Sequence, residues 1–147
     1  MAVTELLQRE INRGKGKPQS RRLEFAQHIL RAFALTRSER IRKRSDFQAA
    51  YRFGRRFNSR HFVVIARITG LNHTRIGLSV SKKTGSAVYR NFLKRRIRET
   101  FRTNKKLFCG HAFDLVIITK KGFTRLCSQE IFHELQQVFK TLSSVSY

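Results

Sequence analysis

The segment AVYRNFLKRRIRETFR, residues 87–102, constrains the fold more than any other part of the chain because helical periodicity sorts its side chains by charge. At about 100° per residue, one face of a helix running to about residue 107 collects Tyr89, Leu93, Ile97, Thr100 and Leu107. The opposite face collects the cations and one amide, namely Arg90, Asn91, Lys94, Arg95, Arg98, Arg102 and Lys105. We therefore expect a helix that docks on a sheet by one face and presents a row of cations on the other.

The cationic row favours phosphate binding over an ordinary solvated helix face. Solvated faces mix signs, since Glu–Lys pairs four residues apart support a helix, yet Glu99 is the one acid in this segment. The whole chain repeats the imbalance, with 32 Lys or Arg against 9 Asp or Glu and a net charge of +23. Such a charge is usually tolerated where a polyanion binds. Nucleic acid is the leading partner and an anionic membrane surface the second.

The remaining composition indicates a cytoplasmic protein of 147 residues, long enough for one domain with a core. No run of about 18 apolar residues is present to span a membrane, and the N-terminus lacks the apolar core of a signal peptide. The two cysteines, Cys109 and Cys127, lack the paired spacing of a zinc site. We expect two free thiols in a reducing compartment.

Residues 1–34 differ in character from the rest of the chain. The stretch RGKGKPQSRR, residues 13–22, holds the only Pro and five cations, which is typical of a flexible basic linker. Helical spacing on either side of it allows short helices at 3–11 and 23–35. The sequence thus predicts a basic N-terminal extension over 1–34 and a nucleic-acid-binding domain over 35–147.

A capped helix is predicted where this domain begins. The residues SDFQ offer a capping box, with Ser45 as N-cap and Gln48 three residues later. The helix is expected to run to about Phe53, where Gly54 suits a C-terminal cap.

Three strands and a final helix follow from the remaining patterns. β-branched residues predict strands at 61–69 and 74–81, joined as a hairpin by the turn residues GLNH. The second strand alternates, as a half-buried strand with one open face does. The stretch AFDLVIIT, 112–119, is more apolar throughout and is expected to be central. The final helix, 128–142, is expected to bury Ile131, Leu135, Val138, Phe139 and Leu142.

The loop SVSKKTGSAV, ahead of the basic helix, is a second candidate for anion binding. Lys82 and Lys83 lie at the end of a predicted strand and Gly85 in the following turn. Backbone N–H groups at a helix start can hold an anion, although a plain loop explains the pattern equally well. The spacing of a P-loop is absent.

Catalysis by the protein itself is not expected. Metal-dependent phosphodiester cleavage typically needs clustered carboxylates, and those of this chain are scattered. Asp46 and Glu130 are better explained as helix-start residues. No histidine pairing can be read from the positions of His61, His73 and His111.

The joint motif GLSVSKKTGSAVYRNFLKRRIRE, residues 77–99, resembles the signature of the bacterial ribonuclease P protein subunit. That signature is a strand ending in SVSKK followed by G-x-AV-x-RNR-x-KR-x-x-RE. The resemblance continues through 40–64 and 114–122 and covers roughly 35–142. It implies an α+β fold, a compact two-layer α/β sandwich whose four-stranded sheet has a left-handed βαβ crossover. The general handedness rule alone points the other way.

The resemblance also implies a function as a subunit of an endoribonuclease. The protein of this family assists a catalytic RNA that uses Mg²⁺ to cleave the 5′ leader from precursor tRNA; no catalytic or metal-binding residue is expected in this chain. Its partners are then ribonuclease P RNA and precursor tRNA, and no protein partner or membrane is expected. The residues that match the family's RNA-contacting positions are Lys82, Lys83, Arg90, Asn91, Lys94, Arg95 and Arg98.

The same resemblance places the single-stranded leader in a cleft between the first helix and the sheet. Phe47 and Tyr51 match aromatic positions of that helix and suit stacking on unpaired bases. Core packing is expected for part of their surface.

One position departs from the family motif, because RNR is here Arg90-Asn91-Phe92. Phe92 is expected at the flank between the core face and the cationic row, where it would stack on a base or pack against residues 1–34. A ribosomal or general RNA-binding protein without a role in cleavage is the alternative function.

Overall fold

The computed structural model describes residues 35–122 and 125–145, and the fold is that of these residues. The helices and the linker expected within residues 1–34 lie outside them. In chain order the elements are α3 (Arg44–Phe53), β1 (Arg55–Asn58), β2 (Phe62–Ile68), β3 (Arg75–Ser79), a 3₁₀ turn (Lys82–Thr84), α4 (Ala87–Thr103), a second 3₁₀ turn (Lys105–Phe108), β4 (Phe113–Thr119) and α5 (Ser128–Ser144).

The four strands form one mixed sheet in the order β1-β2-β4-β3. β4 is antiparallel to β2, with Ile65 opposite Val116, and parallel to β3, with Gly77 opposite Val116. The central position predicted for this strand is confirmed, and its apolar residues on both faces explain it: Leu115, Val116 and Ile117 are all fully buried.

The predicted strands at 61–69 and 74–81 correspond to β2 and β3. The hairpin predicted between them is wrong. β2 and β3 are neighbours in sequence, but β4 lies between them. The strand that does form a hairpin with β2 is β1, which the sequence pattern did not reveal. Its residues are RRFN and three of the four are exposed, so it carries no apolar alternation to mark it.

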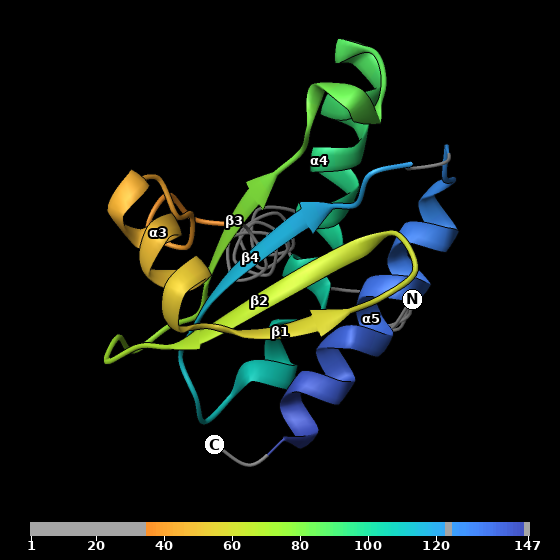
Figure 1. Ribbon diagram of the computed structural model, residues 1–147. Helices are drawn as coiled ribbons and strands as arrows, with labels where there is room; N and C mark the ends of the chain where they lie inside the picture. The colour runs from red at the N-terminus through yellow and green to blue at the C-terminus, as the bar shows by residue number, and fades with distance from the viewer. Residues whose placement is uncertain (1–34, 123–124, 146–147) are drawn as a thin grey trace, which may run out of the picture. The chain divides into compact units, whose positions relative to one another are not determined.

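The helices cover the two faces of the sheet unequally. α4 and α5 lie together on one face, whereas α3 packs on the other (Figure 1). The larger core lies between the sheet and α4 and α5, and the smaller one, with Ile41, Ala50, Ile65 and Val116, lies beneath α3. The five α5 residues predicted to be inward are all buried.

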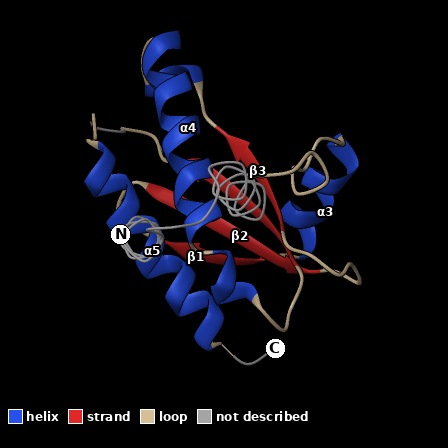
Figure 2. Cartoon of the chain, turned by 180° about the vertical axis from the view of Figure 1, so that it is seen from behind, coloured by secondary structure: helices blue, strands red, loops and turns tan. Residues whose placement is uncertain are grey.

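The connection from β3 through α4 to the parallel strand β4 is left-handed, as expected. With α4 in front of the sheet and β3 running upward, the chain returns on the side of β3 that faces β2, to the left (Figure 2). Most βαβ units are right-handed, so this connection distinguishes the fold.

The helix ends differ in part from expectation. α3 begins one residue before Ser45, with Lys43 as N-cap and no side-chain cap, so the predicted capping box is wrong. The amide N–H groups of Asp46 and Phe47 donate instead to the Lys43 carbonyl, so the chain is already helical there. Gly54 does end the helix; a Cβ at this position would lie 2.5 Å from the Ala50 carbonyl oxygen.

α4 ends at Thr103 rather than near 107. Asn104 caps it, and its Nδ2 donates to the Thr100 carbonyl at 2.7 Å. Leu107 lies in the 3₁₀ turn that follows and packs against the larger core. At α5 the Glu130 carboxylate accepts the Cys127 amide N–H at 2.7 Å, which confirms Glu130 as a helix-start residue.

Candidate nucleic-acid interface

The outer side of α4 is a cationic surface, and burial of the inner side against the sheet fixes the orientation of the helix. Tyr89, Leu93, Ile97 and Thr100 are buried against the sheet, as expected, together with Phe101. On the outer side Asn91 and Arg95 are exposed, and Arg90, Lys94 and Arg98 are half-buried along one flank. In the part of the chain that the structure describes, none of these cations forms an ion pair.

Two cations predicted for the same row have acidic partners instead. Arg102 forms an ion pair with Glu99, three residues earlier on α4. Lys105 Nζ lies 2.7 Å from Glu39 Oε1, in the segment that precedes α3. The cations without an acidic partner therefore end at Arg98 on this row.

A cation that the sequence pattern did not single out lies beside Arg98. The backbone of Glu39–Ile41 extends the edge of β3: the Ile41 N–H donates to the Ile76 carbonyl at 2.9 Å, and the Ile76 N–H to that of Glu39 at 2.8 Å. This brings Arg40 close to α4. Burial, together with the positive charge of Arg40, lowers the pKa of Arg98. Like charges held together in this way favour an anionic partner.

Lys82 and Lys83 lie in the 3₁₀ turn between β3 and α4, and both are exposed. The Lys83 N–H donates to Ser81 Oγ at 3.2 Å. Gly85 follows with φ +149°, and a Cβ there would lie 3.1 Å from the Tyr89 ring. The turn is thus fixed in shape, with its two ammonium groups directed to solvent. An anion at the adjacent helix start stays a prediction.

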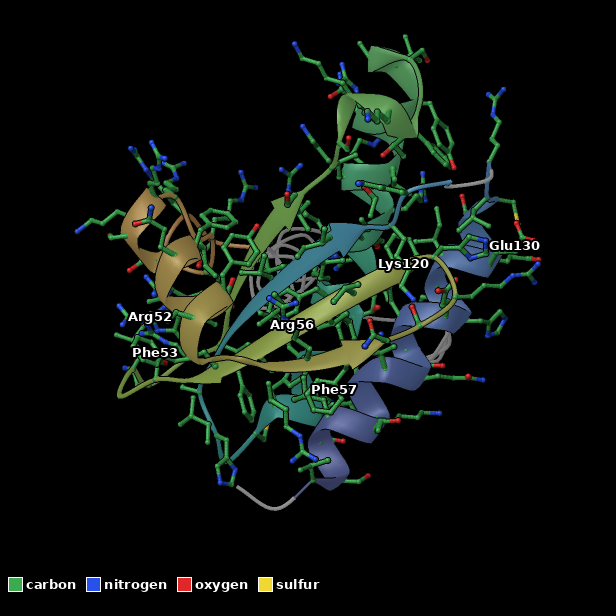
Figure 3. The ribbon with its side chains drawn as sticks, in the orientation of Figure 1. Arg52, Phe53, Arg56, Phe57, Lys120 and Glu130 are labelled. Carbon is green, nitrogen blue, oxygen red and sulfur yellow. The ribbon has the colours of Figure 1, made fainter. Side chains whose placement is uncertain are left out.

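On the opposite face, α3 presents a graded series of aromatic rings. The Phe47 ring is half-buried and fits over Gly77, where a Cβ would lie 2.7 Å from Phe47 Cε1. The Tyr51 ring centroid lies 6.5 Å from that of Phe47, and Tyr51 is 36% exposed. Phe53 is 70% exposed, with the Arg52 guanidinium 5.3 Å from its ring centroid (Figure 3). The inner ring serves the core and the outer rings are open.

The edge strand β1 adds a cation to this face. Arg56 is paired with Ile65 and so shares the face that carries α3 (Figure 3). Phe57, the next residue, packs against the core on the α5 side. Neither Arg56 nor Phe53 was singled out from the sequence, since no periodic pattern marks them.

Two acids expected to be scattered meet beneath α3. Arg75 donates to Asp114 through Nε and Nη2, both at 2.7 Å, and through Nη1 to Asp46 Oδ2 at 3.1 Å. The hydrogen bonds that Arg75 donates to Asp114 outweigh burial and raise the pKa of Arg75. This network fastens the first turn of α3 to β3 and β4, so Asp46 is more than a helix-start residue.

Glu134 fastens the β1–β2 turn to α5. Its carboxylate accepts from the Ser59 hydroxyl at 2.6 Å, the His61 amide at 2.6 Å and the His61 ring at 2.8 Å. Lys120, at the end of β4, donates to the Ser59 carbonyl (Figure 3). Burial raises the pKa of Glu134, but these hydrogen bonds outweigh it and the net direction is down. His61 therefore has a structural role here.

No group of three or more His, Cys, Asp or Glu that could hold a metal occurs within 35–122 and 125–145. Both cysteines are free and exposed. Of the helices in these ranges, none has the length and apolar character needed to cross a membrane.

Comparisons with known proteins agree on one family. The family model described as Ribonuclease P matches residues 35–143. The ribonuclease P protein component of Syntrophus aciditrophicus is 39% identical over 106 residues, which are 72% of this chain and 88% of that protein.

Two solved structures are similar in fold as well. The RNase P protein of Staphylococcus aureus superposes with a TM-score of 0.65 at 37% identity, covering 71% of this chain and 94% of that one. A mutant of the S. aureus protein, described as having defective mRNA degradation activity, gives 0.66 at 34% identity, covering 82% and 96%. The chain therefore belongs to the ribonuclease P protein family.

Proposed function

We propose that this protein is the subunit of a ribonuclease P that binds the catalytic RNA through α4 and the 5′ leader of precursor tRNA through the α3 side of the sheet. The observation that carries the proposal is the sorting of α4. Its inner side is buried in the core, and its outer side bears Arg90, Lys94, Arg95 and Arg98 with no acidic partner among the described residues. Cations that have no acidic partner within the protein are available to neutralise RNA phosphates.

The RNA subunit is assigned to one continuous surface. Lys82 and Lys83 lie in the turn that leads into α4, at the N-terminal end of the helix that carries the row. Asn91 is exposed between the cations and offers an amide that both donates and accepts hydrogen bonds. Arg40 adds a further charge beside Arg98.

The leader is assigned to the opposite face. Tyr51 is open to solvent on α3, whereas Phe47 is committed in part to the core over Gly77. We assign base stacking mainly to Tyr51 and a supporting role to Phe47. A single strand suits this face because unpaired bases stack on aromatic rings while Arg side chains contact the backbone.

Hydrolysis, and the Mg²⁺ ions that it needs, are assigned to the RNA. In support, the acids in the described part of the chain are engaged structurally. Asp46 and Asp114 bind Arg75, and Glu99 binds Arg102. Glu39 binds Lys105, Glu130 accepts the Cys127 amide N–H, and Glu134 binds His61. These carboxylates do not form a metal site, and the role of the protein is to bind and position RNA.

The test is 5′ leader release from precursor tRNA at low Mg²⁺, with protein alone, with ribonuclease P RNA alone and with both. Cleavage at the mature 5′ end only with both supports the proposal. RNA binding without stimulation of a cognate ribonuclease P RNA would favour a general RNA-binding protein. The protein-alone arm should also contain an mRNA, because a mutant of the S. aureus relative is described as having defective mRNA degradation activity. Cleavage of precursor tRNA in that arm would overturn the assignment of catalysis to the RNA.

A further inference from the structure

Four side chains form a stacked column on the side of α4 that faces α5. The Arg125 guanidinium lies 5.4 Å from the centroid of the Tyr89 ring. The Tyr89 ring stacks on Phe92, with centroids 5.9 Å apart and ring planes 25° apart. The Arg96 guanidinium lies 5.6 Å from the Phe92 centroid. Two aromatic rings are thus flanked by a cation at each end.

This column leaves little of the Phe92 ring for a base. Tyr89 precedes Phe92 by one helical turn and Arg96 follows it by one, so the two neighbours approach along the helix axis from both sides. The remaining surface of Phe92 packs against the larger core. Base stacking by Phe92, one of the two roles expected from the sequence, is not favoured by this arrangement. Packing against residues 1–34 concerns residues outside the described part.

The Phe92 ring serves as a platform on which the Arg96 guanidinium packs. Side chains on a helix lean toward its N-terminus, so the guanidinium of Arg96 is delivered to the turn that residue 92 occupies. Arg96 Nε is buried and has no hydrogen-bond partner in the described part of the structure. The nearby acid is Glu99, whose charge reaches Arg96 but whose carboxylate is hydrogen-bonded to Arg102. The Nη groups of Arg96 are therefore placed without a bound carboxylate.

The other end of the column is fixed by hydrogen bonds. The Leu126 N–H donates to the Tyr89 hydroxyl at 2.8 Å. This bond ties the segment ahead of α5 to α4 and keeps the exposed Arg125 over the ring. Both guanidinium groups are thereby pre-organised, which lowers the entropy lost when an anion binds.

We propose that Arg96, held by Phe92, contacts a backbone phosphate of ribonuclease P RNA on the α5-facing flank of α4, with Arg125 as a second cation of the same site. The site replaces the contact that an arginine at position 92 would make, one turn displaced along the helix. The inference rests on the proposed function. It adds to the cationic row a flank that the sequence pattern did not assign.

The salt dependence of affinity tests the proposal, because each phosphate contact adds about 0.7 to 0.9 to the slope of log K against log salt. The full-length protein and its variants are titrated with ribonuclease P RNA over a range of salt concentrations. Arg96→Gln is expected to weaken binding and to lower the slope by about one contact. Lys140→Gln removes one exposed cation from α5, away from the column, and is expected to leave the slope unchanged.

A second variant tests the role of the ring. Phe92→Leu keeps an apolar side chain and the charge of Arg96 but removes the platform, so it should weaken binding. In that background Arg96→Gln should cost less than in the wild-type protein. Thermal unfolding of each variant establishes that it is folded, and Arg96→Gln decides the question by itself if Phe92→Leu does not fold.

The possible failures are distinguishable. A slope for Arg96→Gln equal to that of Lys140→Gln overturns the Arg96 site and leaves the proposed function intact. Equal costs of Arg96→Gln with Phe92 and with Leu at position 92 overturn the platform role. If the wild-type protein does not bind ribonuclease P RNA, the proposed function itself fails.

Discussion

Arg75 holds Asp114 through two parallel hydrogen bonds of 2.7 Å, at a position where the carboxylate has no solvent exposure. The two residues belong to neighbouring parallel strands, in register with one another. Through its remaining nitrogen Arg75 reaches Asp46, so the pair connects the interior of the sheet to α3. Arg75 thus links the helix that carries Phe47 and Tyr51 to a buried carboxylate of the sheet.

Replacing Arg75 by Met should destabilise the fold strongly. The change leaves the buried Asp114 carboxylate beside Arg67 alone, whose Nη2 lies 3.7 Å away. Breaking a buried pair from one side costs about 3–5 kcal/mol, measurable as a lower free energy of unfolding in urea. Asp46→Asn is the control, because it removes only the partly exposed outer partner and should cost at most about 1 kcal/mol. Similar losses in both variants would show that the buried pair has no special weight.

Gly77→Ala should destabilise the α3 side of the sheet. The new Cβ would lie 2.7 Å and 2.8 Å from two atoms of the Phe47 ring and 3.2 Å from Ile41 Cβ. Overpacking of this kind costs about 1–3 kcal/mol. The matched control is Gly70→Ala, because a Cβ at Gly70 would meet nothing within 4 Å. Equal unfolding midpoints for the two variants in urea would contradict the close fit of Phe47 over Gly77.

The Glu134 cluster predicts a pH dependence with a defined sign. Hydrogen bonds from His61 and Ser59 hold the pKa of Glu134 below its ordinary value of 4.5, despite burial. A carboxylate with a depressed pKa stabilises the fold above its unfolded-state pKa, and this contribution is lost as the pH falls through the folded-state value. The melting temperatures of the wild-type protein and Glu134→Gln should differ at pH 6, and this difference should shrink as the pH falls below about 4.5. A constant difference down to pH 3 would mean that the charge of Glu134 has no such role.

The features predicted well from the sequence are those that local periodicity determines. The buried faces of α4 and α5 follow from residues such as Leu93 and Leu135, whose spacing sorts side chains within one helix. Strand pairing depends instead on distant parts of the chain. The order of the sheet required β4 to enter between β2 and β3, so turn residues at 70–73 gave a misleading hairpin.

The same reason limits the prediction of the site. The charge of Arg40 acts on Arg98 because the chain at Glu39–Ile41 pairs with the edge of β3, which no local pattern reports. The contact between Arg75 and Asp114 likewise exists only once the parallel pairing is known. The orientation of Arg96 over Phe92 is local to one helix. Helical periodicity sorts apolar and charged residues onto different faces, so it does not mark a ring and a cation that pair four residues apart.

Tyr51→Ala tests the assignment of the leader to the α3 side of the sheet. Tyr51 is 36% exposed and stands one turn beyond Phe47, so its removal should leave the core beneath α3 in place. Stacking of one base on an aromatic side chain contributes about 1–3 kcal/mol. In a complex with ribonuclease P RNA, the variant should bind precursor tRNA about 5- to 150-fold more weakly. Its affinity for mature tRNA, which lacks the leader, should be unchanged. An equal loss with both tRNAs would place the contact of Tyr51 on the tRNA body or the RNA subunit, and no loss with either would remove Tyr51 from the interface.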